Sequence, residues 1–137
     1  MSPFPYPHIF IHLLTFYRRD DWAKFTNYRW FPFSDKVIEW FWTCVRSWPP
    51  AQRSRLLWFA TGTTRVPING FEDLQGPHGR LHFTIEWARG VNGLPTRHPS
   101  FNRIGLPSYT DYTSLERNLT SAVDAAHVSR RGIPIVD

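Results

Sequence analysis

Eight consecutive residues alternate polar and apolar side chains without an exception, and they read Arg80-Leu81-His82-Phe83-Thr84-Ile85-Glu86-Trp87. Successive side chains of a β-strand point to opposite faces of its sheet, so a period of two predicts a half-buried strand. We therefore expect a strand over residues 80–87. The elements on either side of it determine the fold class.

A helix is predicted before this strand, beginning at Asp35. Its apolar residues recur at three- and four-residue spacing, which places them on one helical face. Ser34 or Asp35 can cap its first turn, and Pro49-Pro50 ends it. The residues of the predicted buried face are Val37, Phe41, Val45 and Trp48.

A second helix is expected over residues 51–59, and the two helices are expected to form a helical hairpin. Its polar residues Gln52, Arg53 and Arg55 are predicted to face outward. Its apolar residues are predicted to face the core, and they are Leu56, Leu57 and Phe59.

The rest of the chain is predicted to hold two loops and one more helix. Residues 61–79 and 90–107 are rich in Gly and Pro, which predicts loops. The last helix is expected to start near Thr113, where Thr113-Ser114-Leu115-Glu116 forms a capping box, and to fray beyond His127. Its buried face is expected to hold Leu115, Leu119 and Ala122. The order of helices, strand and helix predicts a small α+β domain.

Length and charge restrict the class of protein. A chain of 137 residues is one ordinary domain, and 42% hydrophobic with 17% aromatic residues is too apolar for a disordered chain. The net charge of +5 is spread along the chain, with no basic run longer than two residues. A nucleic-acid-binding protein gathers its charge on one helix or stripe, so we expect no nucleic-acid partner.

A single cysteine, Cys44, excludes an internal disulfide and the cysteine-rich zinc sites. We expect a reducing compartment, the cytoplasm, with the nucleus as a second location. The longest apolar stretch, residues 9–17, is too short to span a membrane, so no membrane span is expected. The pairs His8/His12 and His78/His82 lack a carboxylate at a matching offset, and we expect no metal and no cofactor.

Several segments follow one another along the chain in an order and spacing that can be compared with known families. They are Val37-Ile38-Glu39-Trp40-Phe41-Trp42, Phe59-Ala60-Thr61-Gly62-Thr63, Arg65-Val66-Pro67, Gly70-Phe71-Glu72-Asp73-Leu74-Gln75-Gly76, Phe83-Thr84-Ile85-Glu86, Leu94-Pro95-Thr96-Arg97-His98 and Phe101-Asn102-Arg103-Ile104-Gly105-Leu106-Pro107-Ser108-Tyr109. Together these segments resemble the C-terminal lobe of a HECT-type ubiquitin ligase. The similarity is greatest to the ligases that carry WW domains upstream, and it covers residues 20–137, with a divergent tail from about residue 126. Residues 1–19 would then be a leader, a vestige of the N-lobe or hinge.

The resemblance implies a small mixed sheet packed with helices, and a ubiquitin-protein transferase. In this family a cysteine accepts ubiquitin from a conjugating enzyme and passes it to a substrate lysine. Here Ser100 occupies the position of that cysteine, with His98 and Asn102 as its flanking supports. Pro99 replaces a threonine, and Pro134 stands where the family has a phenylalanine.

The partners implied are ubiquitin, a conjugating enzyme bound through the N-lobe, and protein substrates. A serine hydroxyl needs a positioned base, whereas a thiol is intrinsically nucleophilic, so we expect impaired or absent transfer. Two alternatives remain open. One is a non-catalytic module that binds ubiquitin or another ligase, and the other is a non-functional gene fragment whose aromatic residues between Trp22 and Trp48 drive self-association.

Overall fold

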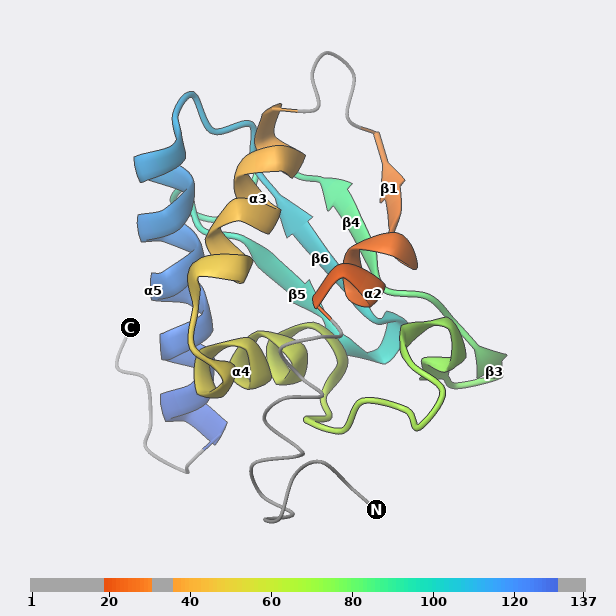
Figure 1. Ribbon diagram of the computed structural model, residues 1–137. Helices are drawn as coiled ribbons and strands as arrows, with labels where there is room; N and C mark the ends of the chain where they lie inside the picture. The colour runs from red at the N-terminus through yellow and green to blue at the C-terminus, as the bar shows by residue number, and fades with distance from the viewer. Residues whose placement is uncertain (1–18, 31–35, 131–137) are drawn as a thin grey trace.

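Residues 19–30 and 36–130 are described by a computed structural model (Figure 1). Several predictions lie outside these residues: the leader, the apolar segment 9–17, His8 and His12, the helix caps Ser34 and Asp35, and Pro134. The helices are α2 (Arg19–Lys24), α3 (Lys36–Ser47), α4 (Pro50–Thr61) and α5 (Tyr112–Arg130), with 3-10 turns η1 (Phe71–Asp73) and η2 (Pro99–Phe101). The strands are β1 (Asn27–Arg29), β2 (Gln75–Gly76), β3 (Gly79–Arg80), β4 (Thr84–Trp87), β5 (Thr96–His98) and β6 (Arg103–Leu106).

A mixed sheet of four strands, in the order β1-β4-β6-β5, forms the centre of the domain. Strands β1, β4 and β6 are parallel, and β5 runs antiparallel to β6. A separate two-stranded hairpin joins β2 and β3. Together with the helices, this sheet confirms the predicted α+β class.

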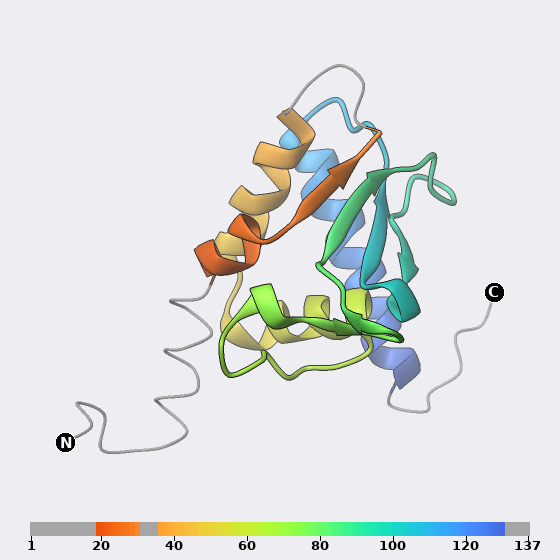
Figure 2. The ribbon, with the colours of Figure 1, turned by 90° about the vertical axis from the view of Figure 1, so that its right-hand side faces the viewer.

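The helices gather on one side of the sheet, where α3 and α4 each pack against α5 (Figures 1 and 2). Figure 1 shows α4 lying across the lower end of α3 instead of alongside it. Both predicted helices exist, but the prediction that they pack against each other as a hairpin is wrong. Only two residues, Trp48 and Pro49, connect the end of α3 to the start of α4 at Pro50, so the chain turns sharply there.

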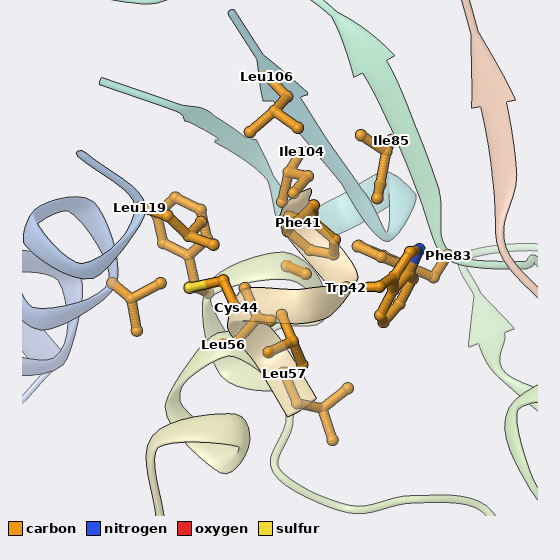
Figure 3. Packing of buried hydrophobic residues seen from close by; sticks show 14 of the residues in the cluster. Phe41, Trp42, Cys44, Leu56, Leu57, Phe83, Ile85, Ile104, Leu106 and Leu119 are labelled. Atoms are coloured by element: carbon orange, nitrogen blue, oxygen red, sulfur yellow. The ribbon is translucent and has the colours of Figure 1, made fainter. Parts of the chain in front are cut away.

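The core lies between this sheet and the helices (Figure 3). The predicted buried residues of α3 and α5 are buried, except that Trp48 is half-buried. Each fully buried Leu, Ile or Phe side chain contributes about 1.5–3 kcal/mol to folding. The largest fully buried side chains are Phe41, Phe83, Leu56, Ile85, Ile104, Leu106, Leu115 and Leu119.

Arg53 does not face outward as predicted. Arg53 is only 2% exposed, and its guanidinium donates a hydrogen bond to the carbonyl of Trp48. Trp48 is the residue that follows the end of α3. The last carbonyls of a helix have no partner within the helix, so a basic side chain there satisfies a bare acceptor. The predicted inward residues of α4 are buried as expected.

The strand predicted over residues 80–87 covers only residues 84–87, because Arg80 belongs to the β2–β3 hairpin. Its burial does not alternate either: Thr84 and Glu86 are buried, whereas Trp87 is 38% exposed. Strand β4 is paired on both edges, so side chains of β1 and β6 flank Thr84 and Glu86 on the face away from the helices.

Both predicted loops contain regular structure. Residues 61–79 include η1 and most of the β2–β3 hairpin, and residues 90–107 include β5, η2 and β6. These strands have two to four residues, too few for a period of two to stand out from the surrounding Gly and Pro. The error matters because β6 is a central strand of the sheet.

The last helix starts one residue earlier than predicted, at Tyr112, and runs to Arg130. Its cap is Asp111 in place of Thr113: the backbone N–H of Ser114 donates to Asp111 Oδ1 over 2.7 Å. The helix continues past His127, where fraying was expected.

Candidate functional site

Ser100 lies at the tip of the connection between β5 and β6. These strands pair antiparallel, with His98 opposite Arg103, and the 3-10 turn η2 closes them. Ser100 is exposed in the middle of this turn. The position predicted for the acceptor is therefore open to a large partner.

The sequence of the turn accounts for its shape. Pro99 stands at the first position of η2, where a missing N–H costs nothing and a fixed φ favours the turn. Asn102 follows it in the left-handed region, with φ 51° and ψ 46°. Asn tolerates this region better than other residues with a side chain, and its N–H donates to the carbonyl of Pro99 over 3.2 Å.

Asn102 fixes the turn from below. Its buried side-chain amide donates to the carbonyls of Gln75 and Leu81, both over 2.9 Å. Its own carbonyl accepts a hydrogen bond from the N–H of Thr84 over 2.9 Å. Asn102 therefore ties the Ser100 turn to the β2–β3 hairpin and to β4, and its amide is committed to these contacts.

His98 ends β5 and is exposed. Among the described residues, no hydrogen bond joins its imidazole to Ser100. The structure thus brings His98, Ser100 and Asn102 into one turn, with no described base poised on the hydroxyl. The roles predicted for these three residues stay predictions.

Arg97 anchors the other side of the same connection, and sequence analysis did not single it out. Its guanidinium donates to the carbonyl of Phe59 over 2.7 Å and to that of Trp58 over 3.0 Å, in the last turns of α4. It also lies 4.3 Å from the centroid of the Trp58 ring. Burial lowers the pKa of this guanidinium below its ordinary value of 12.5. The inward orientation of Arg97 could not be predicted from the sequence, because residues 96–98 were expected to be loop and not a strand with alternating side chains.

An open, shallow depression lies beside β5. Most of its lining residues are apolar, and Arg97 and Ser129 are the polar ones. The lining residues are Phe59, Leu94, Pro95, Arg97, Ala122, Ala125, Ala126 and Ser129.

Cys44 is fully buried in α3, and it cannot replace Ser100 as an acceptor. Burial raises the pKa of its thiol to about 12, and the nearby Glu116 carboxylate adds to the increase. A thiol in this setting carries almost no thiolate at neutral pH.

Two structural tests concern metals and membranes. Residues 19–30 and 36–130 contain no group of three His, Cys, Asp or Glu side chains that could hold a metal ion. Over the same residues, no helix is both long and apolar enough to cross a bilayer.

Comparison with known proteins gives a family. The model for the HECT-domain (ubiquitin-transferase) matches residues 14–128. The chain is 54% identical over 105 residues to E3 ubiquitin-protein ligase RSP5 of Saccharomyces cerevisiae and 53% identical over 105 residues to RSP5 of Chaetomium thermophilum. It is 48% identical over 105 residues to E3 ubiquitin-protein ligase pub1 of Schizosaccharomyces pombe.

These alignments cover 77% of this chain but only 13% of each RSP5 and 14% of pub1. The chain therefore spans a small part of the length of these relatives. The match to the family model, over residues 14–128, includes the whole of the described sheet and helices α3 and α4.

Proposed function

The chain belongs to the HECT-domain (ubiquitin-transferase) family, and on this premise we propose that it is the C-terminal lobe of a ubiquitin-protein transferase with Ser100 in the acceptor position. The observation that carries the proposal is the exposure of Ser100 at the tip of the β5–β6 turn, in a scaffold of this family. Its partners would be ubiquitin, a ubiquitin-conjugating enzyme and protein substrates.

The proposed step is an acyl transfer to oxygen. The hydroxyl of Ser100 attacks the thioester carbonyl that joins ubiquitin to the conjugating enzyme, an ester bond to Oγ forms, and the enzyme's cysteine leaves as a thiol with the hydroxyl proton. A hydroxyl reacts in this way only when a base accepts that proton. Since no hydrogen bond joins His98 to Ser100 among the described residues, transfer is expected to be slow or absent.

Charging with ubiquitin tests the proposal. The chain is incubated with ubiquitin-loaded conjugating enzyme, and adducts are separated under denaturing conditions. We expect a trace of an adduct that resists reductant and is cleaved by hydroxide, and that disappears in Ser100→Ala. An adduct that persists in Ser100→Ala, or that resists hydroxide as an amide does, contradicts Ser100 as the acceptor.

A second candidate function is a non-catalytic module that binds ubiquitin or another ligase. Two observations favour it: no residue within 19–30 and 36–130 places a base on the hydroxyl, and Pro99 removes a backbone N–H from the turn that would receive the end of ubiquitin. In this case no adduct forms, but unmodified ubiquitin titrated into labelled chain shifts the resonances of the Ser100 turn. If no adduct forms and no resonance shifts, both candidate functions are excluded.

A further inference from the structure

The face of the sheet away from the helices carries a partly buried ion pair beside the Ser100 turn. The strand register places Thr84 and His98 on either side of Arg103. Glu86 lies two residues further along β4, and its Oε2 is 3.4 Å from Nη1 of Arg103. The carboxylate is buried, with a residue exposure of 8%, whereas 28% of the Arg103 side chain is exposed.

Arg103 connects this pair to the turn. The centre of its guanidinium lies 5.6 Å from the centroid of the Phe101 ring. Phe101 is the neighbour of Ser100 in η2 and is 53% exposed. A guanidinium over an aromatic face is attracted by the ring quadrupole. The chain of contacts therefore runs from Glu86 through Arg103 to Phe101.

Stability alone explains this pair poorly. Two buried atoms, Glu86 Oε2 and Arg103 Nε, form no hydrogen bond with any described residue. A buried ion pair repays its desolvation only when its remaining donors and acceptors are satisfied, and apolar residues of similar volume often stabilise a fold as well. Its value is then in fixing one geometry.

Burial also decides which role Glu86 can have. Its Oε2 is buried and only 11% of its side chain is exposed, so we expect Glu86 to act through Arg103 and not on a substrate. Arg29 stands opposite Glu86 on β1, but its guanidinium lies 4.5 Å from the centroid of the Trp30 ring. Arg103 is thus the partner that joins Glu86 to the turn.

We propose that Glu86 and Arg103 are positioning residues that hold the Phe101 ring and, with it, the Ser100 turn in one conformation. The inference rests on the proposed function only in treating Ser100 as the acceptor. The positioning itself is a property of the folded chain and can be measured without ubiquitin.

Amide hydrogen exchange of the whole chain tests this coupling. The N–H of Asn102 donates to Pro99 within the turn, so its exchange reports opening of η2, whereas the N–H of Leu119 in α5 reports unfolding of the core. We expect Arg103→Met and Glu86→Gln each to speed exchange at Asn102 by about tenfold without changing exchange at Leu119. Because both act through one contact, the double variant should be no faster than Arg103→Met alone.

A matched control is Arg55→Met. It removes an arginine that also faces a carboxylate, 4.0 Å from Asp124, but that joins α4 to α5 and has a side chain that is 40% exposed. No change at Asn102 is expected. Unchanged exchange at Asn102 in both test variants, or a parallel rise at Leu119, overturns the proposal whatever the outcome of ubiquitin charging.

A kinetic readout then separates positioning from folding. In the background Ser100→Cys with Pro99→Thr, Arg103→Met should lower the maximal rate of ubiquitin acceptance severalfold while the half-saturating concentration and the melting temperature stay unchanged. Arg103→Lys keeps the cation and should restore part of the rate. A rate that falls only in proportion to the folded fraction contradicts positioning.

Discussion

At the scale of single residues, the turn that presents Ser100 depends on Asn102 more than on Ser100 itself. The left-handed backbone at Asn102 reverses the chain, and its amide satisfies two carbonyls of a neighbouring hairpin. The family resemblance implied that Asn102 supports the site, and this role in transfer stays a prediction. What the structure shows is that its side chain, 2% exposed, holds the turn through two backbone carbonyls.

Replacing Asn102 should therefore destabilise the whole domain. In Asn102→Ala the carbonyls of Gln75 and Leu81 lose their donor and an alanine is forced into the left-handed region, so we expect a loss of about 2–4 kcal/mol in the free energy of unfolding. Asn102→Gly relieves the backbone part and should lose less. Urea denaturation followed by tryptophan fluorescence measures both.

Asn118→Ala is the matched control for this loss. The Asn118 amide also donates to a backbone carbonyl, that of Ser114 over 2.8 Å, but within a helix where alanine is favoured. Its effect should stay within about 0.5 kcal/mol. Equal losses for Asn102→Ala and Asn118→Ala would contradict the structural role given to Asn102.

At the scale of elements, predictions were good where an element was long. Helices α3 and α5 have 12 and 19 residues, so their apolar faces repeat over several turns and the buried residues could be recognised. Strands β5 and β6 have three and four residues, and only pairing with β4 identifies them. Arg53 and Arg97 were not predicted as helix caps because the carbonyls they satisfy are set by packing rather than by local pattern.

Helix α5 should show a pH-dependent stability that originates in its cap. The hydrogen bonds from Ser114 hold the pKa of Asp111 below its ordinary value of 3.8. A carboxyl with a lowered pKa in the folded state stabilises the fold above its unfolded pKa, and this contribution is lost as pH falls through the lower folded value. The difference in melting temperature between the native chain and Asp111→Asn should be constant from pH 7 to about pH 5 and shrink below about pH 4.

Thr113→Ala serves as the control for this experiment. Thr113 also lies in the first turn of α5 and is exposed, but it carries no ionisable group. The difference in melting temperature between the native chain and Thr113→Ala should therefore stay constant over the same pH range. A constant difference for Asp111→Asn down to pH 3 would refute the cap.

At the scale of the whole molecule, most of the described aromatic residues between Trp22 and Trp48 contribute to the core in two ways. Trp22, Phe41 and Trp42 belong to the core, and Phe25, Trp40 and Trp48 pack against it. Trp22 stacks on Phe71 with ring centroids 4.9 Å apart, and Trp42 meets Phe41 edge to face. Within the described residues of that segment, Tyr28 and Trp30 are the exposed large aromatics. Single exposed aromatics are normal on soluble proteins and do not form an extended patch.

We therefore expect the chain to sediment as a monomer at every loading concentration, since extended exposed apolar patches are what drive association. Sedimentation velocity at several loading concentrations measures this. A sedimentation coefficient that rises with concentration, and that Tyr28→Ser with Trp30→Ser abolishes, would instead support the fragment interpretation.

The most direct test of the central claim, that Ser100 stands where this family carries its acceptor, is to supply the missing sulfur. The variant Ser100→Cys with Pro99→Thr is incubated with ubiquitin-loaded conjugating enzyme, and the modified residue is located by mass spectrometry. We predict a ubiquitin adduct at residue 100 that reductant removes, with Cys44 unmodified because its thiol is buried. A folded variant that accepts no ubiquitin at residue 100 would contradict the account.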